Sequence, residues 1–135
     1  MKLINTLTLI TCVVIMLVAC GGTGGDSLNG TTWELYSLGQ YAPLPGSQIT
    51  LRFENGQVSG NAGCNSYGGA YQVNGNQVKF EQVISTMMAC TDQSMMDQES
   101  AYLGFLGKVQ SFALAEGQLQ LYRSGGEALT FVPVR

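Results

Sequence analysis

The chain of 135 residues contains no histidine. This absence excludes the serine–histidine–aspartate and cysteine–histidine arrangements of nucleophilic catalysis. It also excludes zinc and iron sites that depend on imidazole ligands. Cysteine is scarce as well, because two of the four cysteines fall within the first twenty residues and only Cys64 and Cys90 remain beyond them. Two thiolates are too few for an all-cysteine zinc site, so we expect no metal, no cofactor and no catalytic residue.

Charged residues are also few, at 11% of the chain, and the formal net charge is −3. The basic residues are scattered and form no run, so the electrostatic footprint of a nucleic-acid-binding protein is missing. We therefore expect no nucleic-acid partner. An enzyme would have to work with carboxylates alone, and the sequence shows no paired acids on facing strands. These features together favour a protein that is not an enzyme.

The long hydrophobic run of the chain lies at its N-terminus and ends in Leu17-Val18-Ala19-Cys20. It follows the basic start Met1-Lys2, and a basic start, an apolar core and small residues before a cleavage point mark a secretion signal. With cysteine at the cleavage point, the segment resembles the lipobox of bacterial lipoproteins. This resemblance implies that residues 1–19 are a removable signal peptide and that Cys20 carries lipid.

The predicted mature chain begins with lipidated Cys20 and a glycine-rich tether over residues 20–27, followed by one domain over residues 28–135. Acyl chains on Cys20 would attach the protein to a membrane, which places it in the cell envelope. Gly21 stands where an aspartate is associated with retention in the inner membrane. In a cell with two membranes, the outer membrane facing the periplasm is therefore favoured.

From Gly30 onward the pattern is mainly that of β-strands. In the segment 49–54 the odd-numbered residues are apolar and the even-numbered ones polar, as expected for a half-buried strand. Asn55-Gly56 follows as a two-residue hairpin signal, because both central residues need positive φ. Further hairpins are predicted around residues 74–76 and 115–117. The candidate strands are 32–38, 49–54, 57–60, 69–73, 77–84, 111–114, 118–122 and 128–132.

Residues 92–106 break the β pattern, because they hold no β-branched residue and repeat apolar residues at helical spacing. Met95, Tyr102 and Leu106 form the centre of this stripe, which Ala101, Leu103 and Phe105 widen. Two residues are candidate N-caps: Asp92 and Ser94. The fold expected is α+β but mainly β: a small, strongly curved antiparallel sheet or barrel of about seven to eight strands, with one helix inserted at about 92–106.

The alternating positions predict which side chains fill the core. They are Trp33, Leu35, Ile49, Leu51, Phe53, Val78, Phe80, Leu106, Leu119, Leu121 and Phe131. The methionines Met87, Met88, Met95 and Met96 are interpreted as filler of the core and helix face, with an adaptable binding surface as the alternative. Glu99 is interpreted as an ordinary solvated helix residue, with a buried carboxylate as the alternative.

Two elements of the sequence stand out from this pattern. The first is Gly60–Tyr71, which includes Gly63-Cys64-Asn65, and the second is Ser85-Thr86-Met87-Met88-Ala89-Cys90. In this order, with the helix and the closing strands behind them, they resemble the META domain over about residues 28–132. Bacterial members are heat-inducible HslJ-like lipoproteins. The resemblance implies links to heat response, novobiocin resistance and secretion or motility, and it supplies no catalytic residues.

Cys64 and Cys90 would meet an oxidising compartment after export, where disulfides persist. A bridge between them would close a loop of 27 residues and contribute about 3 kcal/mol in the chain-entropy model. The alternative is a pair of buried, unpaired cysteines that act as small apolar side chains. The sequence alone does not supply the Cα separation that decides between these two interpretations.

Four residues of the two motif elements are candidates for a binding or motif loop: Asn61, Asn65, Tyr67 and Thr86. The first three would line a polar pocket, although Asn65 would equally stabilise a turn through its side chain. The neighbouring glycines are expected to serve bulges and tight bends of a curved sheet rather than a ligand. They are Gly60, Gly63, Gly68 and Gly69.

Two functions are compatible with these observations. The first is a lipid-anchored, non-catalytic envelope protein that acts through contacts with an unidentified protein partner, in envelope stress or antibiotic tolerance. The alternative is a small-molecule module that holds a hydrophobic ligand in the curved sheet. A filled core would favour the first function, and an internal apolar cavity would favour the second.

Overall fold

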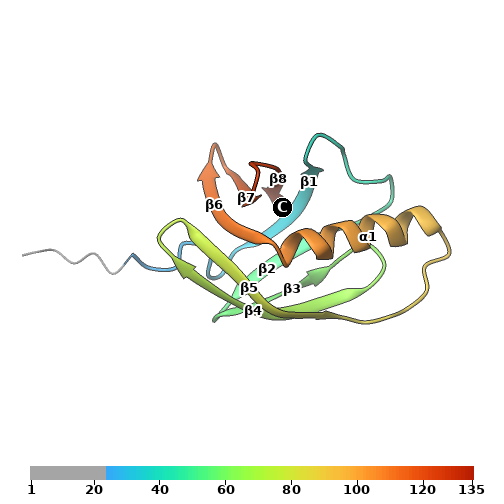
Figure 1. The fold of residues 1–135 in the computed structure, drawn as a ribbon, viewed down its shortest axis with the longest axis horizontal. Coiled ribbons are helices and arrows are strands. Elements are labelled where there is room, and N and C mark those ends of the chain that lie inside the picture. The colour runs from blue at the N-terminus through green and yellow to red at the C-terminus, as the bar shows by residue number, and fades with distance from the viewer. Residues whose placement is uncertain (1–23) are drawn as a thin grey trace, which may run out of the picture.

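The computed structural model describes residues 24–135 (Figure 1). The predicted signal peptide, the cleavage site and Cys20 lie outside the described residues. The described part forms eight antiparallel strands and one helix, and each strand pairs with its neighbour in sequence until the last strand closes on the first. The expected mainly β fold with one inserted helix is confirmed, and the curved sheet is a closed barrel.

The elements fall within a few residues of their predicted places. Their bounds are β1 Thr32–Leu38, β2 Thr50–Glu54, β3 Gln57–Asn61, β4 Ser66–Asn74, β5 Gln77–Ser85, α1 Gln93–Leu106, β6 Val109–Ala115, β7 Gln118–Arg123 and β8 Ala128–Pro133. The largest difference is at β4, which begins three residues earlier than expected because Ser66 and Tyr67 pair with the end of β3. Ile49 forms an isolated bridge with Ala62 and does not join β2.

Glycine is required where the backbones of β4 and β5 approach each other closely. The register of the two strands shifts between Gly68 and Ala70, and Gln82 on β5 takes a φ of +51°. A Cβ at Gly69 would lie 2.8 Å from the carbonyl oxygen of Glu81, which is closer than packed atoms approach. The expectation of a bulge at these glycines is confirmed, and the bulge supplies part of the curvature that closes the barrel.

The interior of the barrel is one hydrophobic cluster to which every strand and the helix contribute. All eleven residues predicted to be buried are buried. The helix adds Tyr102, Phe105 and Leu106, whereas Ala101 of the predicted stripe is exposed. Leu28 is fully buried, and the hydroxyl of Tyr71 donates to the carboxylate of Asp26. The last residues of the predicted tether therefore already contact the barrel.

The helix α1 lies along one side of the barrel (Figure 1). Of the two candidate caps, Asp92 is the N-cap, and its carboxylate accepts hydrogen bonds from the backbone and hydroxyl of Ser94. These bonds lower the pKa of Asp92. Among the residues described, no helix is both long enough and apolar enough to cross a bilayer. The connection from β5 to α1 lies at one end of the molecule, and the described chain begins at the opposite end.

Candidate functional site

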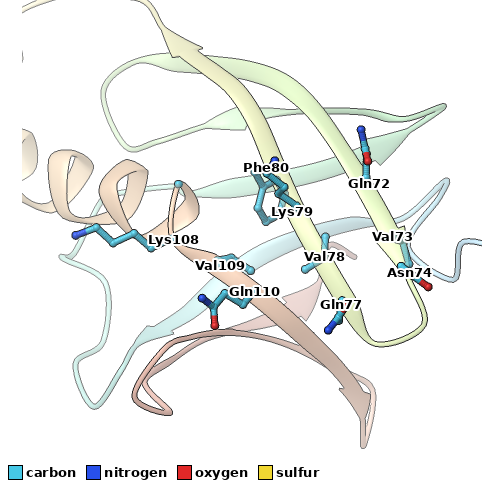
Figure 2. A pocket seen from close by; sticks show the side chains of 11 residues that line it. Gln72, Val73, Asn74, Gln77, Val78, Lys79, Phe80, Lys108, Val109 and Gln110 are labelled. Carbon is cyan, nitrogen blue, oxygen red and sulfur yellow. The ribbon is translucent and has the colours of Figure 1, made fainter.

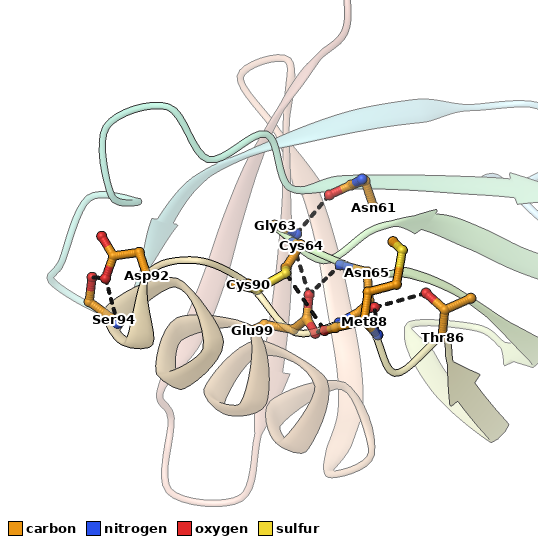
Figure 3. Close-up of a disulfide and its surroundings, with 10 residues drawn as sticks. All are labelled: Asn61, Gly63, Cys64, Asn65, Thr86, Met88, Cys90, Asp92, Ser94 and Glu99. Carbon is orange, nitrogen blue, oxygen red and sulfur yellow. Dashed lines mark hydrogen bonds between the residues drawn. A yellow bond between two sulfur atoms is a disulfide. The ribbon is translucent and has the colours of Figure 1, made fainter.

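The two motif elements of the sequence meet around the side chain of Asn65, at the start of β4 (Figure 3). Asn65 Nδ2 donates to the Glu99 carboxylate over 2.5 Å and to the Met88 carbonyl over 3.2 Å. Its Oδ1 accepts from the Thr86 hydroxyl over 3.0 Å and from the Met88 N–H over 2.7 Å. Both protons and both lone pairs of the amide are therefore used. We call the surrounding group the Asn65 cluster: Cys64, Asn65, Thr86, Met88, Cys90 and Glu99.

Glu99 projects from α1 into the Asn65 cluster and is only 7% exposed. Besides the Asn65 side chain, it accepts the backbone N–H groups of Cys64 and Asn65 over 2.9 and 2.6 Å. Burial by itself would raise the pKa of this carboxyl, but the hydrogen bonds from Asn65 and Cys64 outweigh burial and lower it. The interpretation of Glu99 as a solvated helix residue is wrong, because its carboxylate joins the helix to the loop before β4.

Cys64 and Cys90 form the disulfide that the sequence left open, with their Cα atoms 5.9 Å apart. This separation lies within the usual range for bridged cysteines. The bridge ties the end of the connection between β5 and α1 to the start of β4. It is part of the Asn65 cluster, so a covalent link and a hydrogen-bond network hold the same connection.

The connection between β5 and α1 is anchored at every second residue. Thr86 donates its N–H to the Ser66 carbonyl, Met88 bonds to Asn65 through both backbone groups, and Cys90 is bridged to Cys64. Met87 lies between two anchored residues, and its side chain is 96% exposed. Alternate anchoring thus fixes the backbone while the Met87 side chain points to solvent.

Three exposed apolar side chains lie close together in the sequence here, and we call them the Ile84 patch. They are Ile84, Met87 and Met88, with exposed fractions of 75%, 96% and 59%. The interpretation of Met87 and Met88 as core filler is therefore wrong. Met95 and Met96 on α1 are half-buried, as filler of the helix face would be. The patch borders an open cleft on the outer face of β3, β4 and β5, whose volume is about 660 Å³.

Tyr67 does not join the Asn65 cluster but lies inside the barrel. Its hydroxyl donates to the Thr50 carbonyl over 2.8 Å and lies 2.7 Å from the Tyr102 hydroxyl. Since the single proton of Tyr67 goes to a carbonyl, the Tyr102 hydroxyl must donate to Tyr67. Burial raises the pKa of both phenols. A Cβ at Gly60 would lie 2.0 Å from the Thr50 oxygen, so glycine is required beside this pair.

Asn61 also lies apart from the cluster, at the end of β3. Its carboxamide oxygen accepts the N–H of Gly63 over 2.7 Å, which forms a local turn before Cys64. Of the four candidate loop residues, the structure thus brings Asn65 and Thr86 together, and it places Asn61 and Tyr67 elsewhere. Binding of a ligand by any of these four residues stays a prediction.

The buried carboxylate was the alternative interpretation of Glu99, although the sequence holds a signal that favours it. Glu99 is three residues before Tyr102 and seven before Leu106, so it shares the buried face of α1. A carboxylate on such a face needs donors, and the side chain and N–H of Asn65 and the N–H of Cys64 supply them. With three hydrogen bonds already accepted and its pKa lowered, this carboxylate is poorly suited to act as a general base. The chemistry of the Asn65 cluster is that of a structural clamp.

Comparisons with known proteins bear on the family and the fold. A family model described as the META domain matches residues 26–135. A search of curated proteins finds no match. The chain is similar to a protein from Burkholderia xenovorans solved by NMR, with 28% identity, a TM-score of 0.65, and coverage of 79% of this chain and 83% of that one.

Two further solved structures share the fold. One is an NMR structure with 18% identity and a TM-score of 0.65, covering 78% of this chain and 91% of the other. The second is a crystal structure of a DUF4847 family protein from Bacteroides vulgatus, with 13% identity, a TM-score of 0.53 and coverage of 78% and 93%. The barrel, the order of the two motif elements and the match of the family model lead to one conclusion: the chain belongs to the META-domain family.

Proposed function

We propose that this protein is a lipid-anchored, non-catalytic component of the cell envelope that acts through protein contacts made by the Ile84 patch. The observation that carries the proposal is the pairing of a rigid backbone with exposed apolar side chains. Burying apolar surface is the main driving force of association, and methionine adapts its shape to different partners. Met87 contributes nothing to the interior, yet its neighbours in sequence are held by hydrogen bonds and a disulfide.

The position of the patch supports a partner other than the anchoring membrane. The described chain begins at Gly24, at one end of the molecule, and the connection that carries Met87 lies at the other end (Figure 1). A lipid on Cys20 would therefore hold the Ile84 patch away from the bilayer that carries the anchor. A protein in the envelope space or on the facing layer would be within reach. The links of the family to heat response and antibiotic tolerance agree with such a role.

A photo-crosslinking residue placed at Met87 is expected to form protein adducts in living cells, because this side chain would lie in the contact. The matched control is the same residue at Leu114, which is exposed on β6 outside the patch. Adducts are read from gel shifts and identified by mass spectrometry. Equal adducts from both positions, or none from Met87, would overturn the proposal.

Lipidation is tested separately. Changing Cys20→Ala is expected to move the protein from the membrane fraction to the soluble fraction, because acyl chains on Cys20 supply the attachment. Mass spectrometry of the wild-type protein is expected to find a lipid-modified N-terminus at Cys20. An unmodified N-terminus at another residue would contradict this prediction while leaving the contact proposal intact.

The second candidate, a module for hydrophobic small molecules, has one feature in its favour. An open cleft of about 780 Å³ runs between α1 and the segment 38–44, and much of its lining is apolar. Its apolar residues include Leu38, Tyr41, Leu44, Ala101, Phe105 and Leu129. The barrel interior, in contrast, is packed with core side chains. A hydrophobic ligand would therefore have to use this outer cleft and not the inside of the curved sheet.

A further inference from the structure

The barrel has a weak seam between β5 and β6. These strands are joined at one register position, Gln77 with Ser111, whereas every other neighbouring pair is joined at three or more. β5 continues eight residues beyond Gln77, to Ser85, and among residues 24–135 no strand is in register with this stretch on this side. The end of α1 and the first residues of β6 lie opposite, at a distance that leaves a cleft (Figure 2).

Backbone groups of β5 face this seam. In an antiparallel ladder, successive residues direct their N–H and C=O groups to opposite neighbours. The Asn76 carbonyl accepts the Phe112 N–H over 2.9 Å, so Asn76 faces β6. By alternation Val78 and Phe80 face the same side. The ladder has ended before Phe80, so the N–H and C=O of this residue point into the seam, where the described part of the chain offers them no strand partner.

The seam opens into a cleft of about 580 Å³. Val78, Lys79 and Phe80 form one wall, and Lys108, Val109 and Gln110 form the other. A second cleft of about 380 Å³ shares Phe80 and Gly107 with the first and continues beside β5 as far as Ser85. We call the two clefts together the β5 slot. Its lining includes the apolar side chains of Val78, Phe80 and Val109, one wall is a strand edge, and the slot follows the direction of β5.

We propose that the β5 slot accepts an extended, acidic segment of a partner polypeptide, which adds to β5 as a strand. An unpaired strand edge is a template for such addition, in which backbone hydrogen bonds give affinity and side-chain pockets give specificity. The N–H and C=O of Phe80 would supply the first of these bonds. The slot meets the Ile84 patch at Ile84, which lines the smaller cleft. The proposal rests on the strand edge at Phe80 and the two lysines of the larger cleft, and it does not depend on Met87 or Met88.

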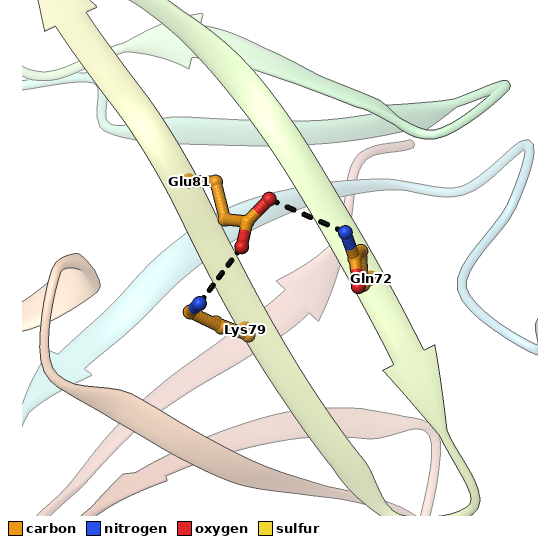
Figure 4. A network of polar contacts seen from close by, with 3 residues as sticks. All are labelled: Gln72, Lys79 and Glu81. Carbon is orange, nitrogen blue, oxygen red and sulfur yellow. Dashed lines mark hydrogen bonds and ion pairs between the residues drawn. The ribbon is translucent and has the colours of Figure 1, made fainter.

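The charges around the slot favour an acidic occupant. Lys79 and Lys108 are the two charged residues that line the larger cleft. Figure 4 shows that Lys79 is held on the outer face by Glu81, which also accepts from Gln72. This ion pair is exposed, so it leaves the ammonium group available to a second carboxylate.

The test uses the detergent-solubilised full-length protein and a capped heptapeptide of alternating glutamate and valine. Titration is expected to shift the backbone amide signals of Phe80 and Gln110 in NMR spectra and to slow hydrogen exchange of the Phe80 N–H. A peptide with lysine in place of glutamate is expected to bind roughly ten-fold more weakly or worse. A peptide N-methylated at alternate positions is expected to lose binding, because it lacks the donors for the edge.

The variant Lys108→Glu is expected to weaken binding of the acidic peptide by roughly ten-fold, because it reverses a charge on the slot wall. The matched control is Arg135→Glu, an equal charge change at an exposed residue that does not line the slot. Signal shifts centred on Met87 would overturn the proposal, as would a lack of shifts at millimolar peptide. Shifts of the Phe80 amide signal that depend on protein concentration without peptide would overturn the proposal, because they would show that a second copy of this chain occupies the slot.

Discussion

Replacing Glu99 with alanine is expected to lower the free energy of unfolding by about 3 to 5 kcal/mol. The change removes the acceptor of three donors: the N–H groups of Cys64 and Asn65 and the Nδ2 of Asn65. A buried donor left without a partner costs about 1 to 3 kcal/mol, and water entering the space would relieve part of that. Chemical denaturation of the wild-type protein and the variant at neutral pH measures the difference.

Two variants separate this effect from helix propensity and from simple loss of charge. Asp97→Ala removes an exposed carboxylate from the same helix. In the described structure this carboxylate accepts a hydrogen bond only from Gln93, so the variant is expected to change stability little. Glu99→Gln keeps one oxygen for the backbone donors but turns an amide toward Asn65 Nδ2, so an intermediate loss is expected. Equal stabilities of Glu99→Ala and Asp97→Ala would show that the Asn65 cluster does not hold the fold.

The same carboxylate makes stability depend on pH. Because the pKa of Glu99 is lowered in the folded protein from an ordinary value near 4.5, the unfolded chain takes up this proton first on acidification. Its contribution is present above about pH 4.5 and is lost as the pH falls through the lower pKa of the folded state. The wild-type free energy of unfolding is therefore expected to fall more steeply below pH 4.5 than that of Glu99→Gln.

Local patterns in the sequence predict most of the barrel. Residues 49–54 alternate cleanly, and Asn55-Gly56 supplies the positive φ angles of the following turn, +51° and +76°. These signals are local, because strand period and turn chemistry depend on adjacent residues. The same holds for α1, whose cap at Asp92 and buried face both follow from residues within one helix.

The Asn65 cluster could be predicted only in part, because its contacts join residues far apart in the chain. Asn65 and Glu99 are 34 positions apart, and no periodicity relates them. The spacing of Glu99 to Tyr102 indicates a buried position, but the donors that make burial acceptable belong to another element. The preferred interpretation of Met87 as core filler was wrong for a similar reason. Apolar composition suggests burial, whereas alternate anchoring of Thr86 and Met88 turns Met87 outward.

Loss of the Cys64–Cys90 disulfide is expected to lower the free energy of unfolding by about 3 kcal/mol without changing the fold. The bridge closes a loop with a sequence separation of 26, and in the chain-entropy model it acts by restricting the unfolded chain. The hydrophobic cluster inside the barrel does not include either cysteine. The double variant Cys64→Ser, Cys90→Ser should therefore show a lower melting temperature and an unchanged circular dichroism spectrum.

The disulfide and the Asn65 network hold the same connection, and their effects on it are expected to be coupled. The hydrogen bonds at Met88 keep the backbone placed when the bridge is absent, so the cysteine variant should retain slow hydrogen exchange at the Met88 N–H. Adding Glu99→Ala to the cysteine variant should speed that exchange. The combined loss of unfolding free energy should differ from the sum of the two separate losses by about 0.5 kcal/mol or more. Two free thiols in unfolded protein purified without reductant would contradict the bridge itself. If the two losses of unfolding free energy add strictly, the disulfide and the Asn65 network are independent restraints on the backbone around Met87.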